Sequence, residues 1–157
     1  MPERPSERLK MLKITLPEAP APVAAYQPVV QEGALAWVSG QIPLQNGELM
    51  VSGSVPEQVP VEDATAAARQ CAINALAALQ AFLGSIDRVA SVVRVGVFVA
   101  CGESFSQHSV IANGASELFE QVFGESGKHA RAATGASSLP LRASVEVEVL
   151  VSVSESE

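Results

Sequence analysis

The segment 89–100 constrains the fold more than any other part of the chain. Its sequence, Val-Ala-Ser-Val-Val-Arg-Val-Gly-Val-Phe-Val-Ala, is apolar at nearly every position and rich in β-branched valine. A run of this kind is typical of a β-strand that is covered on both faces. We therefore predict that 89–100 is a central strand of a sheet.

An amphipathic helix is predicted on each side of this strand. From 61 to 82, small and apolar residues recur at alternating steps of four and three, and Gly84 follows as a C-terminal cap. The segment 105–123 repeats this spacing, and Gly124 ends it. The alanine-rich face of the first helix predicts close packing on a sheet, since small side chains let backbones approach.

The other strands complete an α+β pattern. They are predicted at 26–30, 34–38, 48–52, 130–138 and 143–153, with turns at Glu32-Gly33 and Gln45-Asn46-Gly47. The order is three strands, helix, strand, helix and two strands, which predicts a sandwich of one sheet and two helices. A short helix at 6–12 and a proline-rich stretch predict an N-terminal arm, 1–23, before a single domain, 24–157.

Composition narrows the class of protein. The chain has 157 residues, of which 48% are hydrophobic and only 17% are charged, so a lone subunit would expose much apolar surface and an oligomer is expected. The net charge of -7 disfavours nucleic acid as a partner. The charged, proline-containing N-terminus does not have the pattern of a signal peptide, and no apolar run reaches membrane-spanning length. We expect a soluble, cytoplasmic protein without a membrane partner.

The cysteine and histidine residues do not indicate a metal site. Cys71 lies in a helical pattern and Cys101 ends a strand-like run, so both are predicted to be reduced core residues. The only histidines, His108 and His129, have no cysteine or acidic residue at a ligand-like spacing. No metal site is expected.

The strongest chemical pattern lies near the C-terminus. Arg131 stands in a small-residue run and offers a planar fork of donors that matches a carboxylate. Along 143–153, Glu146 and Glu148 share one strand face, where either they are solvated surface residues or one of them orients a water. Tyr26, the sole tyrosine, is either an ordinary strand residue or a hydroxyl that faces a ligand.

Several segments together resemble the RidA/YjgF family, also called the L-PSP endoribonuclease family. They occur in the family's order, and the resemblance covers about 24–153 with almost no gaps at its ends. They are Tyr26, Ser39-Gly40-Gln41-Ile42-Pro43, the helix from Asn113 to Phe123, Ala130-Arg131, Leu139-Pro140 and Val145-Glu146-Val147-Glu148. The family implies a chorismate-mutase-like α+β fold, a homotrimer and sites in clefts between subunits.

The resemblance also implies a reaction. Well-known members hydrolyse reactive 2-imino and enamine acids to 2-keto acids and ammonia without a cofactor. By position, Arg131 matches the family's substrate-carboxylate arginine and Glu146 the glutamate assigned to the hydrolytic water. Tyr26 and Gly40 match residues that line the cleft, and Asn113 matches an asparagine often found in the second helix.

The chain departs from the family at the arginine motif. Where members commonly have Arg-Ser-Cys-Val-Glu-Val, this chain has Arg-Ala-Ala-Thr-Gly-Ala at 131–136, so that Ala133 replaces the usual cysteine and only its backbone can serve the substrate. The loop before Arg131 and the N-terminal arm are also longer than usual. These differences indicate a divergent branch of the family.

Three functions follow from the resemblance and the composition. The first is an imine/enamine deaminase that protects against metabolite damage, which requires Arg131 and Glu146 together. The second is a non-catalytic trimer that binds a small carboxylate and acts as a sensor or partner protein. The third is an endoribonuclease, which the net charge of -7 disfavours because phosphate contacts dominate nucleic-acid affinity.

Overall fold

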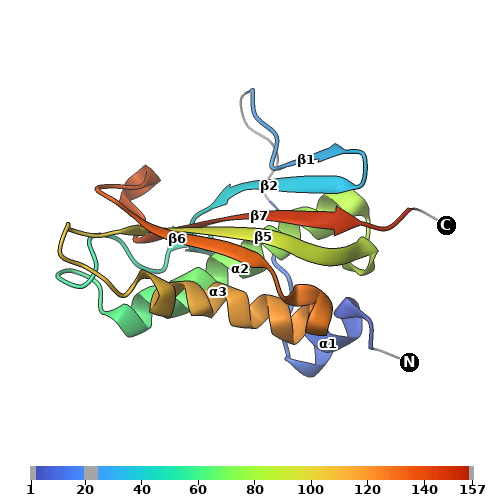
Figure 1. The fold of residues 1–157 in the computed structure, drawn as a ribbon, viewed down its shortest axis with the longest axis horizontal. Coiled ribbons are helices and arrows are strands. Elements are labelled where there is room, and N and C mark those ends of the chain that lie inside the picture. The colour runs from blue at the N-terminus through green and yellow to red at the C-terminus, as the bar shows by residue number, and fades with distance from the viewer. Residues whose placement is uncertain (1–2, 20–24, 156–157) are drawn as a thin grey trace.

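A mixed five-stranded sheet with two long helices on one face forms the body of the protein (Figure 1). The computed structural model describes residues 3–19 and 25–155. The sheet order is β1-β2-β7-β5-β6, in which only β5 and β6 run parallel. The strands are β1 (Val29–Glu32), β2 (Leu35–Gln41), β5 (Val89–Ala100), β6 (Ala130–Ala136) and β7 (Val145–Val153). The predicted α+β class is confirmed.

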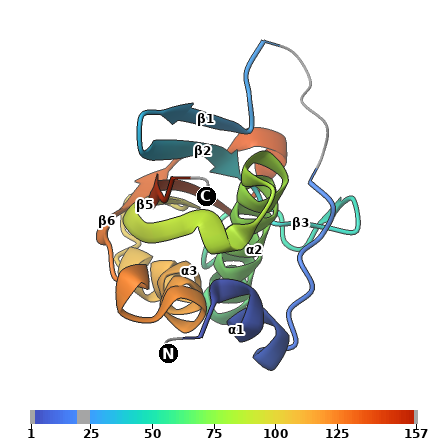
Figure 2. The ribbon, with the colours of Figure 1, turned by 90° about the vertical axis from the view of Figure 1, so that its right-hand side faces the viewer.

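The helices follow the predicted spacing closely. Helix α2 (Val61–Leu83) ends at Gly84, whose φ of 83° lies in the left-handed region that favours glycine. Helix α3 (His108–Phe123) begins three residues later than predicted and ends before Gly124. Both helices lie on the same side of the sheet (Figure 2). The backbones of the two helices approach closely at Gly114 of α3 and the Thr65 carbonyl of α2. A Cβ at position 114 would overlap that oxygen, so glycine is needed there.

The core lies between these helices and the sheet. Along β7 the valines at alternate positions are buried against the helices, whereas Glu146, Glu148 and Leu150 face the other side and are half-buried. Alanines of α2 and valines of β5 and β7 supply nearly half of the core residues. We call the side of the sheet that carries Glu146 and Glu148 the open face.

The prediction that β5 is covered on both faces is wrong for the single chain. β5 is an interior strand, between β7 and β6, but Val93 and Arg94 are exposed. Both helices pack on one face (Figure 2), and no described helix covers β5 on the other. The apolar residues on that side remain available for another surface.

Several shorter elements lie between the main strands and helices. The predicted turn at 45–47 joins β3 (Leu44–Gln45) to β4 (Glu48–Leu49), so the strand expected at 48–52 is much shorter than predicted. Short 3-10 helices precede β5 (η1, Ile86–Arg88), follow α3 (η2, Gly124–Gly127) and precede β7 (η3, Pro140–Arg142).

The N-terminal helix α1 (Pro5–Met11) packs against the body of the protein. Ser6 donates hydrogen bonds from its amide and its hydroxyl to the carboxylate of Asp87 in η1, at 2.8 and 2.7 Å. Leu9 is buried in the core. Helix α1 lies next to α3 (Figure 2). This packing positions residues 12–19, which then run toward the cavity described below.

Candidate functional site

Glu146 projects from β7 onto the open face, close to the neighbouring strand β2. The β2–β7 register shifts between Val38 and Gln41, so the strand predicted to end at Val38 continues through a bulge to Gln41. Gly40 lies in this bulge, and a Cβ there would overlap Oε1 of Glu146. Glycine at position 40 therefore makes room for the carboxylate.

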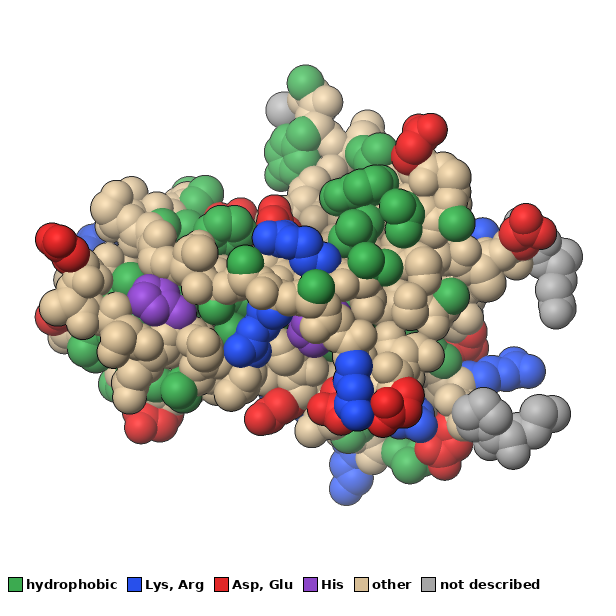
Figure 3. Space-filling view, in the orientation of Figure 1, with side chains coloured by type: hydrophobic (Ala, Val, Ile, Leu, Met, Phe, Trp, Pro, Cys, Tyr) green, Lys and Arg blue, Asp and Glu red, His purple; other side chains and the backbone are tan. Residues whose placement is uncertain are grey.

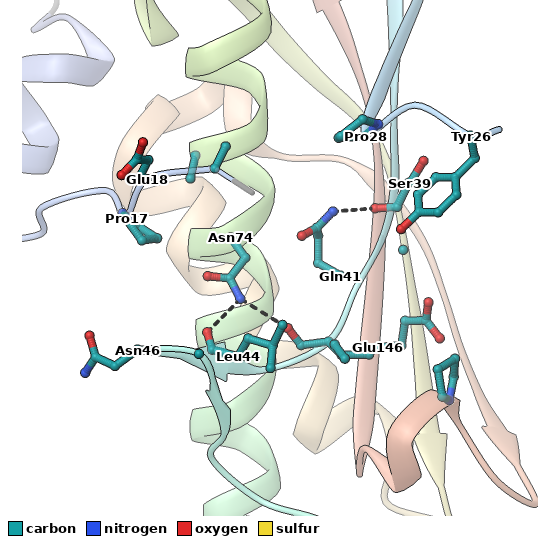
Figure 4. Close-up of a pocket in the computed structure, with 16 residues that line it drawn as sticks. Pro17, Glu18, Tyr26, Pro28, Ser39, Gln41, Leu44, Asn46, Asn74 and Glu146 are labelled. Atoms are coloured by element: carbon teal, nitrogen blue, oxygen red, sulfur yellow. Dashed lines mark hydrogen bonds between the residues drawn. The ribbon is translucent and has the colours of Figure 1, made fainter. Parts of the chain in front are cut away.

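The Glu146 carboxylate lines a cavity of about 710 Å³ (Figure 4). The rest of its wall comes from the bulge, Tyr26, the segment 42–47, helix α2, η3 and the N-terminal segment around Glu18. Asn74 of α2 shapes it by donating hydrogen bonds to the carbonyl oxygens of Ile42 and Leu44, at 3.1 and 3.0 Å. We call this space the Glu146 cavity.

Burial and charge both raise the pKa of Glu146. Desolvation raises its pKa above the ordinary value, and the nearby charge of Glu148 raises it further. Glu18 is a second carboxylate in the wall, and no lysine, arginine or histidine is among the described residues that line the cavity. A carboxylate with a raised pKa is a better base than an ordinary one, and it can accept a proton from water.

Tyr26 lies in the wall instead of in the sheet. Strand β1 begins at Val29, so the strand predicted from Tyr26 starts three residues later. The tyrosine side chain is exposed and lies on the same side of the cavity as Glu146 (Figure 4). The structure contradicts the interpretation as an ordinary strand residue, and the hydroxyl that faces a ligand stays a prediction.

Arg131 projects from the edge strand β6 toward helix α3. Its Nη1 donates to Oδ1 of Asn113 at 2.8 Å and to Oγ of Ser116 at 3.1 Å. Both contacts use Nη1, and the guanidinium has further donors on Nη2 and Nε. This shallow pocket, of about 290 Å³, also includes Lys128 and His129, and we call it the Arg131 pocket.

Within one chain the predicted site residues fall into two groups. Tyr26, Gly40 and Glu146 line the Glu146 cavity, whereas Arg131 and Asn113 line the other pocket. Ala133 packs against the core and lines neither space. In a single chain, therefore, the arginine and the glutamate line separate spaces.

Sequence reasoning missed several residues of both pockets. Asn74 and Glu18 belong to the Glu146 cavity, and Ser116 and His129 belong to the Arg131 pocket. Ser116 follows Asn113 by three residues, which places the two on one helix face, and that spacing was a usable signal. No local pattern indicates that His129 meets this face.

The cysteines are reduced, as predicted, although only Cys71 is a core residue. Burial raises the pKa of the Cys71 thiol. Cys101 is partly exposed, and its Sγ lies 3.4 Å from Nε2 of His108. Over residues 3–19 and 25–155, no group of three His, Cys, Asp or Glu residues is arranged to hold a metal ion. None of the helices in this part of the chain is long and apolar enough to cross a membrane.

Comparisons with known proteins place this fold and these residues in a family. Residues 6–153 match the family described as "YjgF/chorismate_mutase-like, putative endoribonuclease". The chain therefore belongs to the RidA/YjgF family, and the predicted chorismate-mutase-like fold is confirmed.

Three individual proteins show how similar its relatives are. Protein TCP17 of Trypanosoma cruzi is 43% identical over 94% of this chain and 93% of its own length. A 2-iminobutanoate/2-iminopropanoate deaminase of Dermatophagoides farinae is 30% identical over 88% of this chain and 93% of its own. The crystal structure of Atu1372 from Agrobacterium tumefaciens, a protein of unknown function, is 41% identical over 96% of this chain and 93% of that one, with a TM-score of 0.88.

Proposed function

We propose that this protein hydrolyses small 2-imino and enamine acids to 2-keto acids and ammonia. The observation that carries this proposal is the carboxylate of Glu146, fitted against Gly40 in a cavity where burial raises its pKa. The similarity to a protein named as a 2-iminobutanoate/2-iminopropanoate deaminase supports the same chemistry.

The reaction requires the protein mainly to position the substrate and a water molecule. An enamine acid takes up a proton at carbon to give its imine, and water then adds to the imine carbon. Glu146 accepts one proton of that water and then gives it to the nitrogen of the resulting carbinolamine. The C–N bond breaks to release ammonia, and the hydroxyl loses its proton to leave the keto acid. Because the imine carbon is already electrophilic, the main contributions are positioning of the anion and removal of one proton.

In this proposal Arg131 of one subunit completes the Glu146 cavity of its neighbour. Its free guanidinium nitrogens bind the substrate carboxylate in a two-pronged contact. The family motif around Arg131 supports this role, and the separation of the two pockets in one chain calls for a shared site. A homotrimer with one cleft between each pair of subunits meets this need.

The open face of the sheet supports such an assembly. Val30, Trp37 and Leu150 form a cross-strand row on β1, β2 and β7. Trp37 is 46% exposed and Val30 is 53% exposed, and hydrophobic side chains gather over β1 and β2 (Figure 3). Covering this row would remove apolar area from water, which favours association.

The direct test supplies an imine and follows its decay. An amino-acid oxidase would generate 2-iminobutanoate in situ, and semicarbazide would trap what remains. We expect added protein to lower the trapped imine in proportion to its concentration, and sedimentation to give a trimer. Decay at the spontaneous rate, with a pyruvate-like acid still bound, would instead support the non-catalytic binder.

An endoribonuclease is the weaker alternative, although the family description includes that word. The net charge is -7, and two carboxylates line the larger cavity without a cation among its described lining residues. Such a surface repels phosphates.

A further inference from the structure

A serine and a histidine in the Arg131 pocket are hydrogen-bonded in the manner of a nucleophile and its base. Oγ of Ser116 lies 2.8 Å from Nε2 of His129, and Nδ1 of the same ring lies 2.6 Å from the carbonyl oxygen of Gly127. We propose that Ser116 and His129 form a second hydrolytic site, which cleaves small esters that carry a carboxylate.

The carbonyl of Gly127 determines which ring nitrogen holds the proton. A carbonyl oxygen can only accept, so the contact at 2.6 Å places a proton on Nδ1 of His129. In the neutral ring Nε2 is then an acceptor, and the hydroxyl of Ser116 must donate to it. This is the arrangement that a base needs before it can take the proton from a serine.

Packing holds the imidazole in this orientation. Phe119 meets the ring edge-on, with centroids 6.0 Å apart and an interplanar angle of 87°. Gly127 is buried and belongs to η2, which follows α3 directly. The histidine therefore has a fixed tautomer and two fixed neighbours, while Ser116 and the ring are each only partly buried and border the pocket.

The surroundings suit an oxyanion and an anionic substrate. Nη1 of Arg131 donates to Oγ of Ser116 at 3.1 Å, which stabilises negative charge on that oxygen. Asn113 accepts from Arg131 through Oδ1, so its amide nitrogen carries two donors one helical turn from Ser116. The remaining guanidinium nitrogens can bind a carboxylate, whereas Glu117 and Glu120 at the rim limit the site to a small, singly charged acid.

The chemistry balances with water as the only co-reactant. Ser116 Oγ attacks the ester carbonyl, and its proton passes to Nε2 of His129. The C–O bond to the alcohol breaks, and His129 returns the proton to the leaving oxygen, which leaves an acyl group on Ser116. Water then attacks this acyl group while His129 again accepts and returns a proton, which releases the acid and restores the serine. Arg131 serves both proposed activities, whereas Glu146 takes no part in this one, so Glu146→Gln should abolish imine hydrolysis and leave ester cleavage intact.

The test uses the full-length protein at pH 8 and a matched pair of esters. The first, 4-acetoxybenzoate, carries a carboxylate remote from the ester, and its methyl ester does not. We expect 4-hydroxybenzoate to be released from the charged ester about tenfold or more faster than its methyl ester is released from the neutral one, as one charge-assisted contact predicts. Mass spectrometry of acid-quenched protein should find an acetyl group on the peptide that contains Ser116.

Two variants and two controls decide the assignment. Ser116→Ala should remove the acetylated peptide and reduce ester turnover to the background rate, and His129→Gln should slow acylation by roughly a hundredfold. The controls are Ser126→Ala, at an exposed serine of η2, and His108→Gln, at the other histidine. Absence of acetylation at Ser116 in the wild-type protein, or equal losses in the control variants, would overturn the proposal and leave a structural hydrogen bond.

Discussion

The Glu146 cavity and the Arg131 pocket differ in nearly every physical property. The first is about 710 Å³, partly apolar, and carries two carboxylates. The second is about 290 Å³, shallow, and contains Arg131 and Lys128 beside the carboxylates of Glu117 and Glu120. The Glu146 cavity contains a carboxylate of raised pKa but no cation among its described lining residues, whereas the Arg131 pocket contains two cations but not Glu146. In the proposed deaminase, each chain would therefore supply two separate halves of the site, one in each pocket.

Replacing the base should have the largest effect. Glu146→Gln keeps the shape of the side chain but removes its basicity, so imine turnover should fall by roughly a hundredfold or more. Stopped assays with in situ imine would measure it. Glu148→Gln is the matched control, since Glu148 points the same way but pairs with Arg94 at 3.0 Å. Comparable losses in both variants would show that the assignment of Glu146 is wrong.

Changing the acid-binding half should mainly affect affinity. Arg131→Lys keeps the charge, but an ammonium cannot reproduce a two-pronged contact with a carboxylate. The loss should be about 1.5 to 3 kcal/mol, the range for a hydrogen bond to a charged group. Calorimetric titration with a 2-keto acid gives the affinity. Equal binding by the lysine variant would make Arg131 a structural residue that supports Asn113 and Ser116.

Moving the Glu146 carboxylate without removing it should reduce imine turnover less than Glu146→Gln does. In Gly40→Ala the new methyl group overlaps Oε1 of Glu146, and the flexible side chain must shift. Turnover should fall on the order of tenfold, below the ~100-fold that a 1 Å misplacement can cost. Thermal unfolding should change little, because only the end of a side chain is displaced. Full activity in this variant would mean that the position of Glu146 against the bulge is unimportant.

The smallest expected effect is that of Glu146→Gln on the free energy of unfolding, which should rise at pH 7 although imine turnover falls. The folded-state pKa of Glu146 is raised, so the folded protein binds this proton more tightly than the unfolded chain. That contribution is complete below the ordinary carboxyl range and is lost as pH rises through the raised pKa. Glu146→Gln should therefore increase the free energy of unfolding at pH 7 and have little effect near pH 4. Urea unfolding at both pH values measures this, and a destabilised variant at pH 7 would contradict it.

The sequence predicts the elements of this fold well because their signals are local. The alternation along 145–153, the run 89–100 and the glycines that end both helices correspond to the observed β7, β5 and helix ends. The prediction for β5 failed only where it required a covered second face. An apolar run indicates that a strand will be buried, but it does not indicate whether the same chain provides the cover.

The candidate site was predictable only where a motif spans it. Arg131 and Glu146 lie in one recognisable stretch, yet their separation into two pockets depends on which way β6 and β7 present their side chains. The pair of Ser116 and His129 depends on how α3 packs beside the start of β6. Such a contact arises from tertiary packing, and no spacing in the sequence specifies it.

The most direct test of a shared site mixes two inactive variants. Arg131→Ala retains a good Glu146 cavity, and Glu146→Gln retains a good Arg131 pocket. If each cleft takes one group from each of two neighbours, random mixing in equal amounts should restore about a quarter of wild-type imine turnover, since a cleft is intact only when both of its positions are correctly filled. The subunits would be unfolded together and refolded, with each variant refolded alone as the control. We expect this recovery in the mixed sample, and a mixture no more active than its two components would contradict a site built from Arg131 and Glu146 of different subunits.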